Sequence, residues 1–302
     1  MGLRSSVIAL ACLAAVPWSF ATGQQQVDRR AEVAPDTRVE ISNFAGTVRV
    51  TGWDRNEVRV QGTLGEGASG LGFDAESDEV QIEVEWPRRR RNEPRAESGE
   101  SFLEISVPRG ATLELEALAA SIVVDGVEGE VRIETSAGDI TYGGGARRIE
   151  ADTAAGDIEI DSSATGAVID AESLAGEVLV QFVDADVSIT TVTGDARAIG
   201  GRLIEGDFES TSGTFYFEGE IAAGADVGIE NFNGDVELLI PEDTAADFDI
   251  STYSGSIETE FGYQGQPGEE FTPEQHAEFT LGVGGASVDI ETFAGRVAIR
   301  RR

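Results

Sequence analysis

Apolar and polar residues alternate with a period of two through most of the chain after residue 37. Apolar Val131, Ile133, Ile140 and Tyr142, for example, alternate with polar Arg132, Glu134 and Thr141. This is the pattern of a half-buried strand and not of a helix. A glycine stands between two such segments, and glycine favours a tight bend with positive φ. The pattern therefore predicts units of strand, bend, strand and corner.

This unit recurs along the chain. The positions five before and two after the bend residue are apolar in every copy, and the position three before it is small, mostly Ser, Thr or Asn. One such unit cannot bury its apolar side chains, whereas stacked copies can. The bend residues are Gly46, Ala120, Gly138, Gly156, Gly176, Gly194, Gly213, Gly234, Gly255 and Gly295.

These columns predict an all-β fold, a β-solenoid with coils of about 18–21 residues. Each coil is expected to pair with the next in chain order, with strands about 4.8 Å apart. The small polar column shares the parity of the inward positions. It is therefore expected to form a hydrogen-bonded ladder beside the bend.

Two steps between copies are longer than the rest. The step from Gly46 to Ala120 indicates an insertion at about 62–102, with strands at 80–86 and 102–107. The step from Gly255 to Gly295 spans 40 residues, which we interpret as two periods with one degraded copy and an insertion at 262–278. Residues 62–78 and 262–278 are rich in Gly and polar residues and are predicted to be loops. Residues 24–302 are expected to form one domain.

Residues 1–23 have the pattern of a secretory signal peptide, with Arg4 before an apolar run at 7–16 that is too short to span a bilayer. Ala21 and Gly23 supply the small residues of a cleavage site. A second interpretation makes Cys12 a lipid-attachment site. No later stretch is long enough for a membrane helix, so the product is expected in a periplasm, on a cell surface or outside.

Composition removes several classes of function. The chain has 56 acidic and 22 basic residues and a formal charge of −34, which disfavours nucleic acid binding. All of the basic residues are arginine, so lysine-based catalysis is excluded. Cys12 and His276 are the only residues of their types, which excludes Cys/His zinc sites and Cys–His nucleophile pairs.

Several segments resemble a bacterial family of exported proteins described as putative adhesins, a domain of unknown function related to the head domain of autotransporter adhesins. They are residues 39–48, the Trp-Pro-Arg-Arg-Arg-Arg run at 86–91, residues 103–110 and the repeated Ser-Ala-Gly-Asp-Ile type turns. The resemblance covers about 33–302. It implies a β-helix-like solenoid, and it brings no established activity and no catalytic residues.

An acidic residue follows the bend glycine in half of the copies. Stacked carboxylates at strand spacing repel one another, and calcium, which prefers oxygen ligands, is one way to relieve this repulsion. The alternative is that they face solvent and help to cap the bend. The candidate calcium ligands are Asp139, Asp157, Glu177, Asp195 and Asp235. No other cofactor is expected.

The other candidate residues lie in the insertions, except Trp53, which lies in the copy around Gly46. The candidate anion-binding cluster is Arg88, Arg89, Arg90 and Arg91, for an anionic polymer or lipid head groups, and its alternative is a solvated loop that balances nearby acids. Trp53 and Trp86 are candidates for stacking on sugars, with core packing as the favoured alternative. His276, alone in a polar segment, is not expected to be catalytic.

These patterns favour an exported, non-enzymatic β-solenoid that acts as an adhesin or interaction protein of the bacterial cell envelope or surface. Its partner is expected to be an envelope or surface component such as a polysaccharide. One alternative is a polysaccharide-active β-helix enzyme that works with carboxylates alone. A second alternative is an envelope-stress sensor or regulatory partner.

Overall fold

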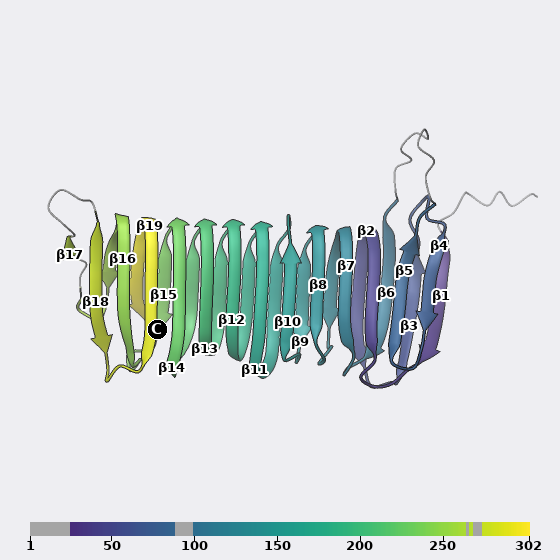
Figure 1. Cartoon of the computed structure of the whole chain (residues 1–302), viewed down its shortest axis with the longest axis horizontal. Coiled ribbons are helices and arrows are strands. Elements are labelled where there is room, and N and C mark those ends of the chain that lie inside the picture. Colours follow the sequence, from purple (N-terminus) through teal and green to yellow (C-terminus); the bar gives the residue numbers. More distant parts are fainter. Residues whose placement is uncertain (1–24, 88–98, 264–265, 268–273) are drawn as a thin grey trace, which may run out of the picture.

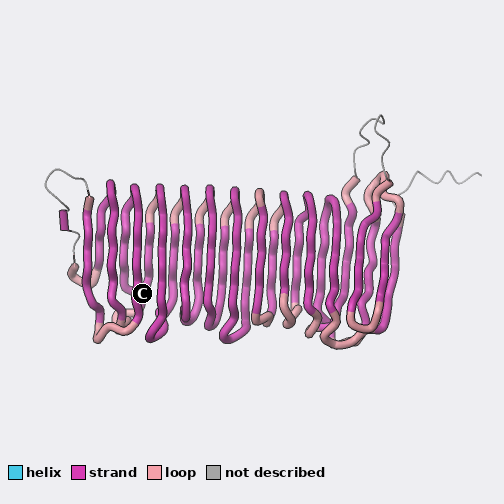
Figure 2. Tube along the Cα trace, in the orientation of Figure 1, coloured by secondary structure: helices cyan, strands magenta, loops and turns pink. Residues whose placement is uncertain are grey.

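The chain forms an elongated stack of β-coils, with the strands perpendicular to the long axis (Figure 1). The computed structural model describes residues 25–87, 99–263, 266–267 and 274–302. Every regular element in these ranges is a strand, as Figure 2 shows, and the predicted all-β solenoid is confirmed. Residues 1–23, including Cys12, lie outside the described ranges.

The strands divide into long ones, which continue through a bend or through the opposite corner of the coil, and short ones, which form half a coil. They are β1 (Gln26–Glu32), β2 (Arg38–Trp53), β3 (Glu57–Thr63), β4 (Gly70–Ala75), β5 (Glu79–Glu85), β6 (Ser101–Pro108), β7 (Thr112–Asp125), β8 (Val131–Ala137), β9 (Ile140–Gly144), β10 (Arg148–Thr153), β11 (Ile158–Ala175), β12 (Val178–Thr193), β13 (Ala196–Ser212), β14 (Phe215–Asn233), β15 (Val236–Ile240), β16 (Ala246–Thr259), β17 (Gln266–Pro267), β18 (Gln275–Leu281) and β19 (Ala286–Arg301).

Equivalent positions of the repeat lie side by side in parallel register. Ile133 of β8 pairs with Ala151 of β10, which pairs with Ala171 of β11. All three side chains are buried, as are the apolar residues two after the bend, so one continuous core runs along the axis. The alternation of apolar and polar residues therefore fixes both the pairing and the buried face.

Most of the bend glycines occupy backbone conformations that other residues rarely adopt, with φ of 145° at Gly194. The small polar column three residues earlier is buried beside them. Ser173 Oγ donates to the carbonyl of Gly156 at 3.1 Å, and Asn231 Nδ2 donates to that of Gly213 at 3.0 Å. In these coils the predicted hydrogen-bonded ladder is present.

The coils at the C-terminal end do not stack in chain order, contrary to our expectation that each coil pairs with the next. The place between Gly255 and Gly295 where we expected a degraded copy is also not a coil in sequence order. Strand β19 lies between β14–β15 on one side and β16 on the other, in parallel register with each. The N–H of Gly234 accordingly donates to the carbonyl of Ala294 at 3.0 Å. The chain advances past one coil position, makes β16 and β18, and returns to fill the gap.

The N-terminal end repeats this arrangement. Strand β2 pairs with β7 on one side, and on the other side with β5 before its bend and β6 after it. The chain thus lays down β2, forms the outer coil from the insertion, and returns on the inner side. The strands predicted at 80–86 and 102–107 are β5 and β6.

Both segments predicted to be loops contain strands, so that prediction was wrong in part. Strand β4 lies within 62–78 and pairs antiparallel with β5, because Leu71 and Phe73 pack against the core. Strand β18 begins within 262–278 and pairs antiparallel with β16, with Ala277 and Phe279 buried. These antiparallel strands, with β1 and β3, cover the open edges of the end coils, where unpaired backbone would favour aggregation.

Candidate functional site

The acidic residues that follow the bend glycines hydrogen-bond to the backbone of the neighbouring coil. Asp139 Oδ1 accepts the N–H of Asp157 at 3.0 Å, and Asp157 Oδ1 accepts that of Glu177 at 2.8 Å. Asp195 and Asp235 make the same bond to Thr214 and Arg296, at 2.9 Å each. These carboxylates therefore satisfy backbone donors at the bend.

Arginines balance part of this column as well. Arg197 pairs with both Glu177 and Asp195, at 3.1 and 2.9 Å. Across the described ranges, no group of three or more His, Cys, Asp or Glu side chains is placed to hold a metal ion. The geometry thus favours the bend-capping alternative, and nothing in it supports the calcium hypothesis for Asp139, Asp157, Glu177, Asp195 and Asp235.

The other candidates have separate environments. The cluster Arg88–Arg91 lies outside the described residues. Trp53 is half-buried and donates from Nε1 to the carbonyl of Glu57 at 2.8 Å, whereas Trp86 packs against the core, as favoured, with its ring centroid 5.5 Å from that of Phe44. His276 lies in strand β18, exposed, with Nδ1 3.4 Å from Asp249 Oδ1.

The outer surface of the strands before the bend, which we call the pre-bend face, carries a column of exposed apolar side chains. They stand two residues before the bend, at an outward position, and are 39–58% exposed. Exposed apolar side chains that gather on one face of a protein are typical of interaction sites. In axial order this apolar column is Phe44, Leu118, Leu174, Val192, Phe232, Phe293 and Tyr253, with smaller residues in the intervening coils.

A column of carboxylates runs beside it, four residues before the bend. None of its members makes an ion pair with any residue in the described part of the chain, although most arginines there do pair with acids. The pre-bend face therefore carries a row of carboxylates that have no ion-pair partner among the described residues. This acidic column comprises Glu116, Glu134, Asp152, Glu172, Glu209, Glu230 and Glu291.

The sequence contains both columns, but our predictions concerned the inward positions and the bend. The alternation of inward and outward positions in the repeat could have revealed the apolar column. A position two before the bend is outward, so the large apolar residues there, such as Phe232 and Leu174, cannot serve the core. Exposed apolar residues that recur at one outward position were therefore the clue.

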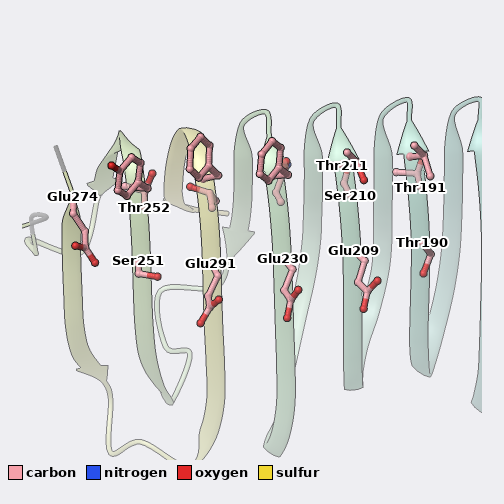
Figure 3. Close-up of a pocket in the computed structure, with 16 residues that line it drawn as sticks. Thr190, Thr191, Glu209, Ser210, Thr211, Glu230, Ser251, Thr252, Glu274 and Glu291 are labelled. Carbon is pink, nitrogen blue, oxygen red and sulfur yellow. The ribbon is translucent and has the colours of Figure 1, made fainter. Parts of the chain in front are cut away.

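A groove of about 580 Å³ lies at the C-terminal part of the pre-bend face. Figure 3 shows Glu209, Glu230 and Glu291 in one row, one carboxylate per strand, with three aromatic rings in a parallel row nearer the bends. Four buried hydroxyls that border the groove, those of Thr191, Ser210, Thr252 and Thr292, have no hydrogen-bond partner in the described part of the chain. A second groove of about 400 Å³ surrounds Phe44 and Trp86 at the other end of the same face.

Asp152 shows the effect of crowding on the acidic column. Burial, and then the negative charges of Glu150, Asp170 and Glu172, raise its pKa to about 6, although Arg132 acts in the opposite direction. Burial and Glu150 also raise the pKa of Asp170. Like charges at strand spacing thus disfavour full ionisation in the middle of the face.

Lowering the pH from 7 to 5 is therefore expected to stabilise the protein. The folded state holds a proton on Asp152 more tightly than the unfolded state does. The stabilisation that results is complete below about pH 4 and is lost as the pH rises through about 6. Asp152→Asn should raise the stability at pH 7 by about 1 kcal/mol, since solvent screens a half-exposed group. Thermal melts at several pH values measure this, with Asp161→Asn on the opposite strands as control. A destabilising Asp152→Asn at pH 7 would contradict it.

No helix in the described ranges is long and apolar enough to cross a membrane. No curated protein matches the chain. Among solved structures, similarity extends to a putative adhesin from Parabacteroides merdae, at 7% identity over 91% of this chain and 96% of the other, with a TM-score of 0.36. A putative cell adhesion protein from Clostridium sporogenes is 10% identical over 92% and 100%, with a TM-score of 0.24.

A putative lipid binding protein from Parabacteroides distasonis is 11% identical over 92% of this chain and 96% of the other, with a TM-score of 0.33. TM-scores this low support no conclusion about function. The match to a protein-family model does identify a family. The model of the Toastrack DUF4097 family matches residues 37–300, from the start of β2 to the penultimate residue of β19, the last strand. The chain belongs to the Toastrack DUF4097 family.

Proposed function

We propose that this protein is an exported, non-enzymatic scaffold that binds a component of the bacterial cell envelope or surface through its pre-bend face. The observation that carries the proposal is the apolar column, exposed along the stack beside an unpaired acidic column. These side chains point outward and are about half exposed, so they can contact a partner. A solenoid presents such a column as an extended surface, which suits a long partner.

The signal-like segment and the regularity of the face support the same proposal. Residues 1–23 have the features that direct a protein to export, where envelope components are within reach. The acidic column recurs from coil to coil along the stack. An active site would instead be expected to interrupt the repeat at one place.

Cosedimentation with the insoluble envelope fraction of the source bacterium tests the proposal. Residues 25–302 should sediment with it, and Leu174→Ser/Phe232→Ser should bind about tenfold less, because two buried apolar contacts are lost. The matched control is Phe102→Ser/Val183→Ser, which changes two similarly exposed apolar residues on other surfaces. Equal sedimentation of wild type and the pre-bend variant would contradict the proposal.

The same incubation separates binding from catalysis. A scaffold should leave the envelope material intact. Release of soluble sugar fragments that disappears with Asp152→Asn would instead establish the polysaccharide-active alternative, since a carboxyl with a raised pKa suits a general acid.

A further inference from the structure

Three aromatic rings from three different strands form a ladder on the pre-bend face. Phe232 of β14 and Phe293 of β19 have ring centroids 4.9 Å apart and planes 7° apart, and Phe293 and Tyr253 of β16 follow at 5.0 Å and 11°. Near-parallel rings at this separation are offset, so part of each ring face stays uncovered. The rings are 58%, 45% and 50% exposed. The insertion of β19 between β14 and β16 makes this aromatic ladder continuous.

The groove beside the aromatic ladder is negative throughout. Glu209, Glu230, Glu274 and Glu291 line it, and its lining contains no arginine. Within the described ranges none of these four carboxylates pairs with a basic side chain. Charge complementarity therefore calls for a ligand that supplies positive charge as well as flat apolar surface.

The spacing restricts the shape of this ligand. Strands β14 and β19 each contribute an aromatic ring and a carboxylate, whereas β13 contributes Glu209 without a ring and β16 contributes Tyr253 without a carboxylate. Neighbouring strands repeat about every 4.8 Å. An extended peptide presents side chains on one side only about every 6.6 Å, so it falls out of register after one or two residues. A chain of pyranose sugars presents one flat ring per repeat, and this repeat is closer to the strand spacing than the side-chain spacing of a peptide is.

We propose that this groove binds a polymer of amino sugars with free, protonated amines, lying along the solenoid axis. Sugars of the polymer would place an apolar face on the aromatic ladder, and an ammonium group on the facing side would lie against a glutamate such as Glu230 or Glu291. This inference rests on the proposed function and assigns the chemistry of its partner. It also gives the exposed rings and the unpaired acids a common role.

Calorimetric titration of residues 25–302 with a glucosamine hexamer, below neutral pH where its amines are protonated, tests this assignment. The N-acetylglucosamine hexamer, which has the same length and no charged amines, is the control ligand. The N-acetylated hexamer, Phe232→Ala, and Glu230→Gln/Glu291→Gln should each weaken binding about tenfold or more, because one lost stacking or charge contact is worth about that factor. Added NaCl should weaken binding of the glucosamine hexamer.

Phe102→Ala and Glu159→Gln change an exposed aromatic and an exposed carboxylate away from the groove, and should leave binding unchanged. Thermal melts confirm that each variant is folded. Equal binding of the two hexamers would overturn the inference, as would tighter binding of an arginine-rich peptide of the same charge or no effect of Phe232→Ala. If envelope cosedimentation still depends on Leu174 and Phe232 in those cases, the proposed function survives and only the ligand chemistry is wrong.

Discussion

Replacing Gly194 by alanine is expected to destabilise the solenoid by about 3–5 kcal/mol, a large effect for one methyl group. A β-carbon at this position would meet the carbonyl oxygen and carbon of Gly176 well inside van der Waals contact. Both partners are backbone, so no side chain can turn away. The φ of 145° adds strain, because residues with a β-carbon rarely adopt it.

The effect should extend beyond the substituted coil. The N–H of Gly194 donates to Ser212 and the carbonyl of Thr193 accepts from Gly176, both at 3.0 Å, so a displaced bend disturbs both neighbours. Hydrogen exchange should therefore show lost protection in β11, β12 and β13 while the distant coils stay protected, as expected for a repeat with nearest-neighbour coupling.

Gly143→Ala is the matched control. Gly143 lies in strand β9, and a β-carbon there would meet Asp125 Oδ1 at 3.5 Å, an ordinary contact. The substitution should change stability by less than about 1 kcal/mol, because alanine loses less backbone entropy than glycine on folding. If both variants melted alike, close approach at the bend would not be what requires glycine.

The repeat columns could predict most of the fold because the residue type in each column meets one structural requirement. Apolar positions five before the bend, such as Ile133 and Ala171, had to be buried, and their alignment in sequence is their alignment in space. The bend glycine and the small polar residue before it were equally readable. Strand pairing, inward face and coil length all follow from these columns.

The order of the end coils could not be predicted, because the copies of the repeat carry the same columns and are interchangeable as pairing partners. The copy around Gly295 carries the same columns as those around Gly234 and Gly255, so it can pair with either. Only connection lengths and the fit of β18 decide the order. The five residues 241–245 carry the chain from β15 to β16, past the place that β19 fills.

The candidate site was predictable in part. The acids after the bend were recognised, but their hydrogen bonds to backbone N–H groups, such as Asp195 to Thr214, depend on geometry that a sequence does not show. The aromatic ladder was beyond prediction as a unit, since Phe293 joins Phe232 and Tyr253 only through the changed coil order.

Replacing Ile290 of β19 by aspartate is expected to destabilise the protein by about 4 kcal/mol, because an unpaired charge enters the core. Ile290 is 0% exposed and pairs with Ile229 on one side and Ile250 on the other. Urea unfolding measures the loss, and hydrogen exchange should show that protection falls in β14 and β15 as well as in β16. Asp289→Asn, one residue away and exposed, should change stability little.

Engineered disulfides test the coil order that makes Ile290 so sensitive. Asp226 and Ser287 are register partners, and parallel neighbours about 4.8 Å apart lie within the range that a disulfide spans. Asp226→Cys/Ser287→Cys should therefore oxidise readily in a chain that starts at residue 25 and so lacks Cys12. Asp226→Cys/Asp247→Cys should not, because β19 separates these strands. The opposite pattern, together with β14 protection unaffected by Ile290→Asp, would mean that the coils stack in chain order and that the aromatic ladder does not form.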